Sequence, residues 1–221
     1  FGAVKEYETA RKLEPDYAEA HAALGQALPI AAVLLEEKES ATSEERDELR
    51  NVRQKLKERA VEALREATRL APRNATYHRE LGNALHSLAA SRSFTRLGIK
   101  EEERDRNEGL VELRRAVALD PADAAAHKAL AERLAGEEAI AEYRAAIRLD
   151  PADVYTRIEI GTLLLNEKDV DGALAELLAA VRIDPKNAKA HLRLGEAFET
   201  LGQVDKAVDE YRKSVDLGPA P

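Results

Sequence analysis

The sequence predicts an all-α solenoid in which pairs of antiparallel helices repeat along the chain. Prolines recur at long intervals, and small residues recur at fixed distances before and after them. Self-similarity with a period of roughly 20 to 50 residues indicates a repeat architecture. The composition agrees, because aromatic residues make up only 4% of the chain and charged residues 34%, a balance that suits helices packed on alanine and leucine. The prolines that mark the repeats are Pro15, Pro72, Pro121, Pro151, Pro185 and Pro219.

The most regular copy of the repeat runs from Asp184 to Leu217, and the prolines near its two ends, Pro185 and Pro219, lie 34 residues apart. A small residue follows each of the first five prolines by ten positions, and another precedes every proline by twelve positions. The residues after the prolines are Gly25, Gly82, Ala131, Gly161 and Gly195, and those before them are Ala3, Ala60, Gly109, Ala139, Ala173 and Ala207.

This pattern resembles the tetratricopeptide repeat, and the resemblance covers nearly the whole chain. It implies a single right-handed superhelical solenoid over residues 1–221, in which the two helices of a repeat touch at the small positions. Because the chain begins inside a repeat and without methionine, we also expect that an N-terminal segment is missing. The expected divisions are an orphan second helix at 1–14 and five complete repeats at 15–71, 72–120, 121–150, 151–184 and 185–218.

Local residue chemistry predicts the turns between repeats. An aspartate precedes the proline at positions 120, 150 and 184, and the residue before a proline is disfavoured in a helix. Two positions after the proline stands a residue whose side-chain oxygen can accept a backbone N–H of the next helix. The expected N-caps are Asn74, Asp123, Asp153 and Asn187.

The first complete repeat carries an insertion of 23 residues between its two helices. We expect its first helix to run past Leu35 into residues 36–39, with a kink at Pro29, because proline removes one intrahelical hydrogen bond. Residues 42–45, Thr-Ser-Glu-Glu, form a capping-box pattern that opens a second helix ending near Leu70. The prediction is a protruding helical hairpin, each helix longer by about three turns, that projects roughly 17 Å beyond the solenoid.

Two further repeats depart from the regular length. The second carries an insertion of 15 residues, and we expect a loop over 91–100 because serine, threonine and glycine gather there. Phe94, Leu97 and Ile99 make this loop unusually apolar. The third repeat is four residues short, and Gly136 is expected to shorten the link between its helices.

The charge balance and composition limit the function classes. With a formal net charge of −8 and no basic stripe, the chain is not expected to bind nucleic acid or anionic membrane surfaces. No apolar run approaches the roughly 18 residues that a membrane-spanning helix needs. The absence of cysteine excludes disulfides, cysteine-ligated zinc and thiol nucleophiles. The compartment stays unknown.

Four of the five histidines stand six residues after a proline. One interpretation is a metal-binding ladder, but equivalent sites in neighbouring repeats lie about 10 Å apart, as packed helices do, whereas zinc–nitrogen bonds are about 2 Å long. We therefore favour half-buried imidazoles, and we expect neither a metal nor another cofactor. No nucleophile–base arrangement and no phosphate-binding glycine loop is readable, so we do not expect an enzyme. The four histidines are His21, His78, His127 and His191.

The resemblance implies that the first helices of successive repeats line a concave groove that holds an extended peptide or a partner helix. An apolar patch inside a charged rim would anchor apolar side chains of that partner. Some family members clamp a C-terminal carboxylate of chaperones, and Lys128, Lys189 and Arg193 match three of their basic sites. Glu132 and Glu159 replace the two asparagines of that clamp, and their charge would repel a carboxylate, so this version is disfavoured. The groove candidates are Arg79, Asn83, Lys128, Tyr155, Ile158, Leu165, Lys189, Leu192 and Arg193, of which Tyr155, Ile158, Leu165 and Leu192 make the apolar patch.

We expect a non-catalytic scaffold or adaptor that binds a protein through this groove and through the insertions. Insertions on one face of a repeat array often mark a binding face, although surface loops also grow at little cost in free energy. Two alternatives stay open: the repeat arm of a larger enzyme, or a permanent structural subunit, including one that self-associates end to end. The candidate contacts of the insertions are Leu49, Phe94, Leu97 and Ile99.

Overall fold

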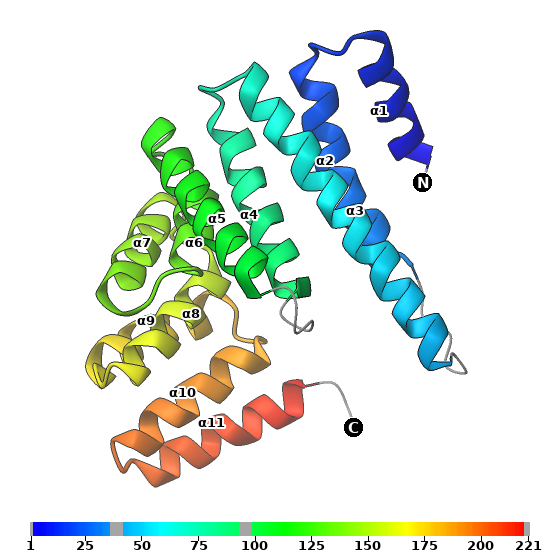
Figure 1. Ribbon diagram of the computed structural model, residues 1–221. Helices are drawn as coiled ribbons and strands as arrows, with labels where there is room; N and C mark the ends of the chain where they lie inside the picture. The colour runs from blue at the N-terminus through cyan, green and yellow to red at the C-terminus, as the bar shows by residue number, and fades with distance from the viewer. Residues whose placement is uncertain (1, 36–41, 93–98, 219–221) are drawn as a thin grey trace. The chain divides into compact units, whose positions relative to one another are not determined.

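The computed structural model describes residues 2–35, 42–92 and 99–218. In these ranges the chain forms eleven α-helices and no β-strand (Figure 1), which confirms the all-α class. The chain divides into two compact units, an N-terminal unit, Phe1–Pro121, and a C-terminal unit, Ala122–Pro221. None of the described helices is long and apolar enough to cross a membrane.

The N-terminal unit consists of helix pairs that share a core of leucine, alanine and valine. Helix α2 packs against α3, α4 packs against α5, and α3 and α4 join the two pairs (Figure 1). Leu24 and Leu28 of α2 meet Ala60 and Ala63 of α3 in one buried cluster. The helices are α1 (Gly2–Leu13), α2 (Ala18–Val33), α3 (Ser43–Leu70), α4 (Ala75–Arg92) and α5 (Ile99–Leu119).

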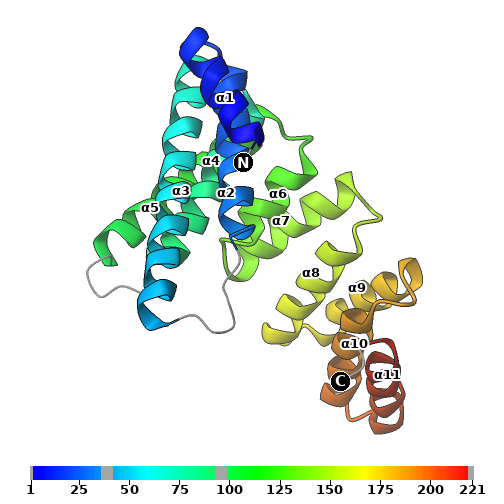
Figure 2. The same cartoon turned by 90° about the vertical axis from the view of Figure 1, so that its right-hand side faces the viewer.

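The C-terminal unit repeats the same scheme three times. Helices α6 and α7, α8 and α9, and α10 and α11 form pairs, and the first helices α8 and α10 also contact each other. Helices α10 and α11 lie side by side in both views (Figure 1 and Figure 2). The core is built around Ile160, Leu177 and Leu194. The helices are α6 (Ala124–Ala131), α7 (Gly136–Leu149), α8 (Val154–Asn166), α9 (Val170–Ile183), α10 (Ala188–Thr200) and α11 (Val204–Leu217).

The turn chemistry predicted between repeats is confirmed. The side chains of Asp123, Asp153 and Asn187 accept backbone N–H groups of α6, α8 and α10 over 3.0 to 3.1 Å. Asn74 accepts the backbone N–H of Tyr77 in α4 over 3.3 Å. Each cap satisfies a donor that the first turn of a helix leaves unpaired.

Helix pairs touch at the small residues that recur in the sequence. A β-carbon on Gly82 would lie 2.7 Å from Cγ of Leu113 and 2.9 Å from the carbonyl oxygen of Gly109. On Gly195 it would lie 2.6 Å from the Cδ1 and Cε1 atoms of Tyr211. Non-bonded carbon atoms prefer separations of about 3.5–4.0 Å, so a larger residue does not fit at either crossing. The expected contact role of the small residues is confirmed at these positions.

The first insertion mainly lengthens α3. This helix has 28 residues, against 14 in α9 and α11. Its predicted capping box is confirmed, because the Thr42 hydroxyl accepts the backbone N–H of Glu45 over 3.2 Å and the Glu45 carboxylate accepts that of Thr42 over 2.7 Å. Two orphan donors at the start of the long helix are thereby satisfied.

Helix α2 ends at Val33, which corrects the prediction that it continues past Leu35. Arg53 of α3 donates hydrogen bonds to the carbonyl oxygens of Ala32, over 3.2 Å, and of Leu35. Basic side chains commonly satisfy the last carbonyls of a helix in this way. Helix α2 passes through Pro29, and residues 36–41 lie outside the described residues. The kink at Pro29 and the distance by which the hairpin projects stay predictions.

The second insertion is more helical than the loop predicted over 91–100, since α4 extends to Arg92 and α5 begins at Ile99. An ion pair holds the two helix ends together. Arg92 donates to the carboxylate of Asp105 over 2.5 Å, and Asp105 is only 1% exposed. Of the predicted contacts in this insertion, Phe94 and Leu97 lie outside the described residues, and only the helical position of Ile99 is described.

The third repeat is short in its first helix, which corrects the prediction of a shortened link. Helix α6 has 8 residues, against 13 in α8 and α10, while residues 132–135 still separate α6 from α7. The backbone N–H of Arg133 bonds the carbonyl oxygen of Leu130, three residues earlier, over 3.0 Å. Such a tight turn is typical of a helix end. Gly136, with φ of +56°, then begins α7.

Candidate functional site

Two lysines and a tyrosine meet on the first helices of the C-terminal unit. Tyr155 of α8 lies between Lys128 of α6 and Lys189 of α10, whose Nζ atoms are 4.7 and 4.8 Å from the centre of its ring. An ammonium group this close to an aromatic face is attracted by the ring electrons. Tyr155 is 50% exposed, so this group, called the lysine–tyrosine stack from here on, is open to solvent.

The repeat spacing explains why these three side chains meet. Tyr155 and Lys189 each stand four residues after the proline that opens their repeat, and Lys128 stands seven residues after its own. Positions three apart lie on the same face of an α-helix. The three residues therefore occupy equivalent faces of α6, α8 and α10, as the predicted groove requires.

Both lysines of the stack form ion pairs with acidic side chains. Lys128 donates to Asp153 over 2.9 Å, and Lys189 donates to Glu159 over 2.7 Å. Burial acts to raise the pKa of Asp153, but hydrogen bonds from the side chain and backbone of Thr156 and from Lys128 outweigh it and lower that pKa. Asp153 therefore stays ionised while it caps α8 and orients Lys128.

The predicted apolar patch is smaller than expected. Ile158 is 1% exposed and packs against Ala180 and Ala190, so its inclusion in an exposed patch was wrong. The two alanines leave room for the isoleucine, which turns toward α9 and α10 instead of the solvent. Leu165 is half-buried against the core of the unit, whereas Leu192 is 39% exposed.

The other basic candidates contact acids of their own helices. Arg193 donates to both carboxylate oxygens of Glu196 over 2.9 and 2.8 Å. Arg79 lies 3.4 Å from Glu80 in α4. Leu49, a candidate contact of the first insertion, is half-buried on α3. Arg193 and Arg79 therefore pair with acids other than those that bind Lys128 and Lys189. Leu49 belongs to α3 of the N-terminal unit.

A polar cavity of about 180 Å³ adjoins α6, α7 and α8 within the C-terminal unit. The polar residues among those that line it are Glu132, Tyr143, Glu159, Thr162 and Asn166. The pKa of Tyr143 is raised mainly by burial and to a smaller extent by the charges of Glu132 and Glu159. Its hydroxyl therefore remains neutral and can donate a hydrogen bond. No lysine or arginine is among the described residues that line this cavity, so it suits a cationic group. Because Glu159 also binds Lys189, the cavity and the stack are neighbours.

The first helices of the N-terminal unit also border a cavity. Asn83 of α4 and Pro29 of α2 line a space of about 310 Å³. Ile30, a residue that the sequence pattern did not single out, is exposed at its edge. It stands four residues after Gln26 on the same helix face, and that spacing was the signal available in the sequence.

The recurring histidines form hydrogen bonds with the turns that open their repeats. One ring nitrogen of His21, His78 and His191 lies 2.9 to 3.1 Å from the carbonyl oxygen of the proline six residues earlier. The other nitrogen of His191 lies 2.6 Å from a carboxylate oxygen of Glu210. Arg157 takes the same position in its repeat, bonding Pro151 over 2.9 Å. The described residues contain no group of three or more side chains arranged to hold a metal ion.

The fold and the site define a helical-repeat protein that presents charged and aromatic side chains on its first helices. Two family models described as tetratricopeptide repeat match residues 134–216 and 52–90, which together make up more than half of the chain. The chain belongs to the tetratricopeptide repeat family. A search of curated protein sequences gives no match.

Solved structures share the fold at low sequence identity. A crystal structure of YrrB, described as a tetratricopeptide repeat protein with an unusual peptide-binding site, is 19% identical, with a TM-score of 0.65 over 98% of this chain and 94% of YrrB. A crystal structure of MamA is 18% identical, with a TM-score of 0.62 over 80% of this chain and 95% of MamA. MamA from Desulfovibrio magneticus RS-1 is 16% identical, with a TM-score of 0.63 over 89% of this chain and 94% of its own.

Proposed function

We propose that the chain is a non-catalytic scaffold whose C-terminal unit holds a protein segment, either an extended peptide or a helix, along α6, α8 and α10. The lysine–tyrosine stack carries this proposal, because its aromatic side chain, Tyr155, is exposed and is contacted by the ammonium groups of Lys128 and Lys189. Tyrosine is enriched among the residues that dominate the binding energy of protein interfaces. Membership of the repeat family supports the proposal, as does the fold shared with YrrB, whose structure is described as containing a peptide-binding site.

The charges around the stack indicate what such a segment carries. The ion pairs of Lys128 with Asp153 and of Lys189 with Glu159 are partly exposed, and such pairs contribute only about 0–1 kcal/mol. An incoming carboxylate can therefore share either lysine at small cost. The neighbouring cavity is lined by Glu132 and Glu159, which are paired with Arg133 and Lys189, so a basic group entering there would share these carboxylates. We expect a segment that sets an acidic residue against the stack and a lysine or arginine toward the cavity.

A pair of matched tyrosine variants tests this function. Partners captured from native extract by the immobilised chain are identified, and their affinities are measured with wild-type, Tyr155→Ala and Tyr17→Ala chains. Tyr17, in the N-terminal unit, is 46% exposed against 50% for Tyr155, so it controls for the loss of an exposed ring. We expect Tyr155→Ala to weaken binding at least about tenfold and Tyr17→Ala to leave it unchanged. Equal affinities for all three chains would refute binding at the stack.

One observation favours self-association as a second function. Helix α11 presents Val208, Tyr211 and Val215 around a shallow cavity of about 290 Å³, and Val215 is largely exposed. Exposed apolar groups on one helix face suit contact with another helix. Sedimentation velocity over a hundredfold range of concentration is the test. We expect a dimer that Val208→Ser with Val215→Ser abolishes; a monomer at every concentration would exclude this function.

A further inference from the structure

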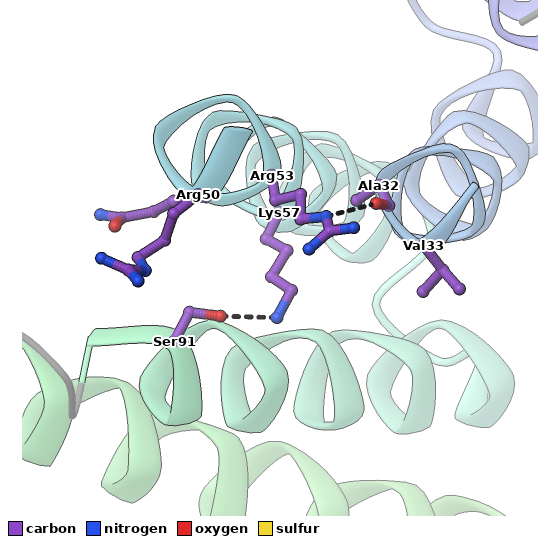
Figure 3. A pocket seen from close by; sticks show the side chains of 7 residues that line it. Ala32, Val33, Arg50, Arg53, Lys57 and Ser91 are labelled. Carbon is purple, nitrogen blue, oxygen red and sulfur yellow. Dashed lines mark hydrogen bonds between the residues drawn. The ribbon is translucent and has the colours of Figure 1, made fainter. Parts of the chain in front are cut away.

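The N-terminal unit holds a second charged site, which we call the basic pocket. It is a cavity of about 430 Å³ where α2, α3 and α4 meet (Figure 3). The side chain of Lys57 extends from α3 toward α4, while that of Arg53 extends toward the end of α2 (Figure 3). The residues that matter are Arg50, Arg53 and Lys57 of α3, Ser91 of α4, and Ala32 and Val33 of α2.

Three cations share this pocket without an acidic residue among its described lining residues. Arg50, Arg53 and Lys57 follow one another at spacings of three and four, which sets them on one face of α3. Like charges at such spacings repel each other. The pKa of Lys57 is lowered mainly by burial and to a smaller extent by the charge of Arg53. Among the residues that the structure describes, the cations of the pocket therefore repel one another, and an anion would relieve this repulsion.

Helix ends fix two of these cations in position. Arg53 donates to the carbonyl oxygens of Ala32 and Leu35 at the end of α2. Lys57 donates to the hydroxyl of Ser91 over 2.5 Å and to a backbone carbonyl oxygen of α4 over 3.2 Å. These acceptors are uncharged, and the end of a helix carries only about half a negative charge. These acceptors hold the side chains in place but by themselves compensate little of the positive charge.

The other charges that the structure describes do not neutralise the pocket. Among the described residues, neither Arg53 nor Lys57 forms an ion pair with a carboxylate. Arg50 pairs with Asp47, one turn earlier, over 2.6 Å, and both side chains are exposed. A pair of this kind adds little stability and exchanges easily. Arg50 is therefore available to a stronger acceptor that enters the cavity.

An apolar rim adjoins the basic pocket. Val33 lines the cavity and is 79% exposed, and its sequence neighbours Ile30 of α2 and Leu34, the residue that follows α2, are exposed as well. Exposed apolar residues beside convergent charges are characteristic of protein-binding surfaces. A free inorganic anion would use the cations but leave this rim in water.

We propose that the basic pocket binds a glutamate or aspartate side chain of an acidic partner segment, while an apolar side chain of the same segment packs on Val33. The planar guanidinium groups of Arg50 and Arg53 match the two oxygens of a carboxylate. The site lies in the N-terminal unit and shares no residue with the lysine–tyrosine stack, so it stands independently of the function proposed above.

Fluorescence anisotropy with a labelled hexapeptide of alternating glutamate and leucine tests the proposal on the full chain. We expect Arg50→Gln with Lys57→Gln to weaken binding at least about tenfold, since each charge-assisted hydrogen bond is strong. Val33→Ser should weaken it severalfold. Lys55→Gln is the matched control, because Lys55 is an exposed cation of the same helix that does not line the pocket. It should bind the peptide as the wild type does.

Three results would overturn the proposal. The first is equal binding of the wild type and of Arg50→Gln with Lys57→Gln. The second is equal binding of a hexapeptide in which glutamine replaces glutamate, or full displacement by inorganic phosphate at millimolar concentration. The third is loss of binding in Lys128→Gln with Lys189→Gln, which would assign the peptide to the lysine–tyrosine stack. Since Lys57 also bonds α4, Arg50→Gln alone serves as the variant that leaves the fold intact, and it too should weaken binding.

Discussion

The carboxylate of Glu210 lies 2.6 Å from Nδ1 of His191, and this hydrogen bond joins α11 to α10. The second ring nitrogen of His191 lies 2.9 Å from the carbonyl oxygen of Pro185. The carboxylate of Glu210 and the carbonyl oxygen of Pro185 are both hydrogen-bond acceptors. One imidazole thus connects the turn that opens the repeat to both of its helices, and His78 makes the equivalent contacts with Glu112 and Pro72.

The first prediction concerns Glu210. Burial acts to raise its pKa, but hydrogen bonds from Lys213 and His191 outweigh burial and lower the pKa. A carboxylate whose pKa is lowered by folding stabilises the native state above its unfolded pKa, and this contribution disappears as the pH falls through the folded pKa. We expect Glu210→Gln to reduce the free energy of unfolding by about 1–3 kcal/mol near neutral pH, measured by urea denaturation, and the difference from wild type to vanish in acid. Asp209→Asn, an exposed change on the same helix, should show neither effect.

The second prediction concerns the crossing of α4 and α5. A β-carbon on Gly82 would lie 2.9 Å from the backbone oxygen of Gly109, which cannot move aside as a flexible side chain can. We expect Gly82→Ala to cost about 1–3 kcal/mol in urea denaturation of the full chain. Gly2→Ala is the control, because a β-carbon there meets no atom within 4 Å. An unchanged midpoint for Gly82→Ala would show that the two helices separate easily.

The third prediction separates the ring of Tyr155 from its hydroxyl. The ammonium groups of Lys128 and Lys189 lie over the ring, so the aromatic face is the part that organises the stack. We expect Tyr155→Phe to bind a partner segment within about threefold of wild type and Tyr155→Leu to lose at least about tenfold. Isothermal titration with the captured partner measures both. A large loss in Tyr155→Phe would shift the role to the hydroxyl.

The fourth prediction uses the buried ion pair of Asp105 and Arg92. Burial raises the pKa of Asp105, although the nearby arginines oppose it. When the folded pKa is raised, the native state binds protons more readily than the unfolded state, so stability increases as the pH falls through the folded pKa toward the lower unfolded pKa. Wild type should therefore gain stability relative to Asp105→Asn as the pH is lowered from neutral, as measured by chemical unfolding. The opposite slope would mean that Arg92 outweighs burial. Asp47→Asn, an exposed change in the same unit, should give no slope.

The helix boundaries were predictable wherever they depend on residues a few positions apart. The capping box of Thr42 and Glu45 and the cap at Asp153 need only partners three residues away. The early end of α2 was not predictable in this way. It depends on Arg53, which reaches Ala32 across 21 residues of sequence, and the long helix had to be placed before that contact could be seen.

The candidate site was predictable in its residue types but not in its burial. Lys128, Tyr155 and Lys189 were expected in the groove, and the structure brings them together. Ile158 has an equivalent groove position by spacing, yet its burial is decided by the small size of Ala180 and Ala190 on neighbouring helices. The basic face of α3 was visible as a spacing of three and four, but the same spacing is typical of a solvated helix face. Only the approach of α2 and α4 makes it a pocket.

The length of α3 has a consequence for how the protein can change over time. All of its fully buried residues lie between Ala60 and Ala67, so its first turns contribute no residue to the deep core. Substitutions in the first turns are less constrained by packing than those around Ala60. The N-terminal part of α3 can therefore vary its surface from one descendant to the next while the repeats that carry it stay the same, and new binding preferences can arise without loss of the fold.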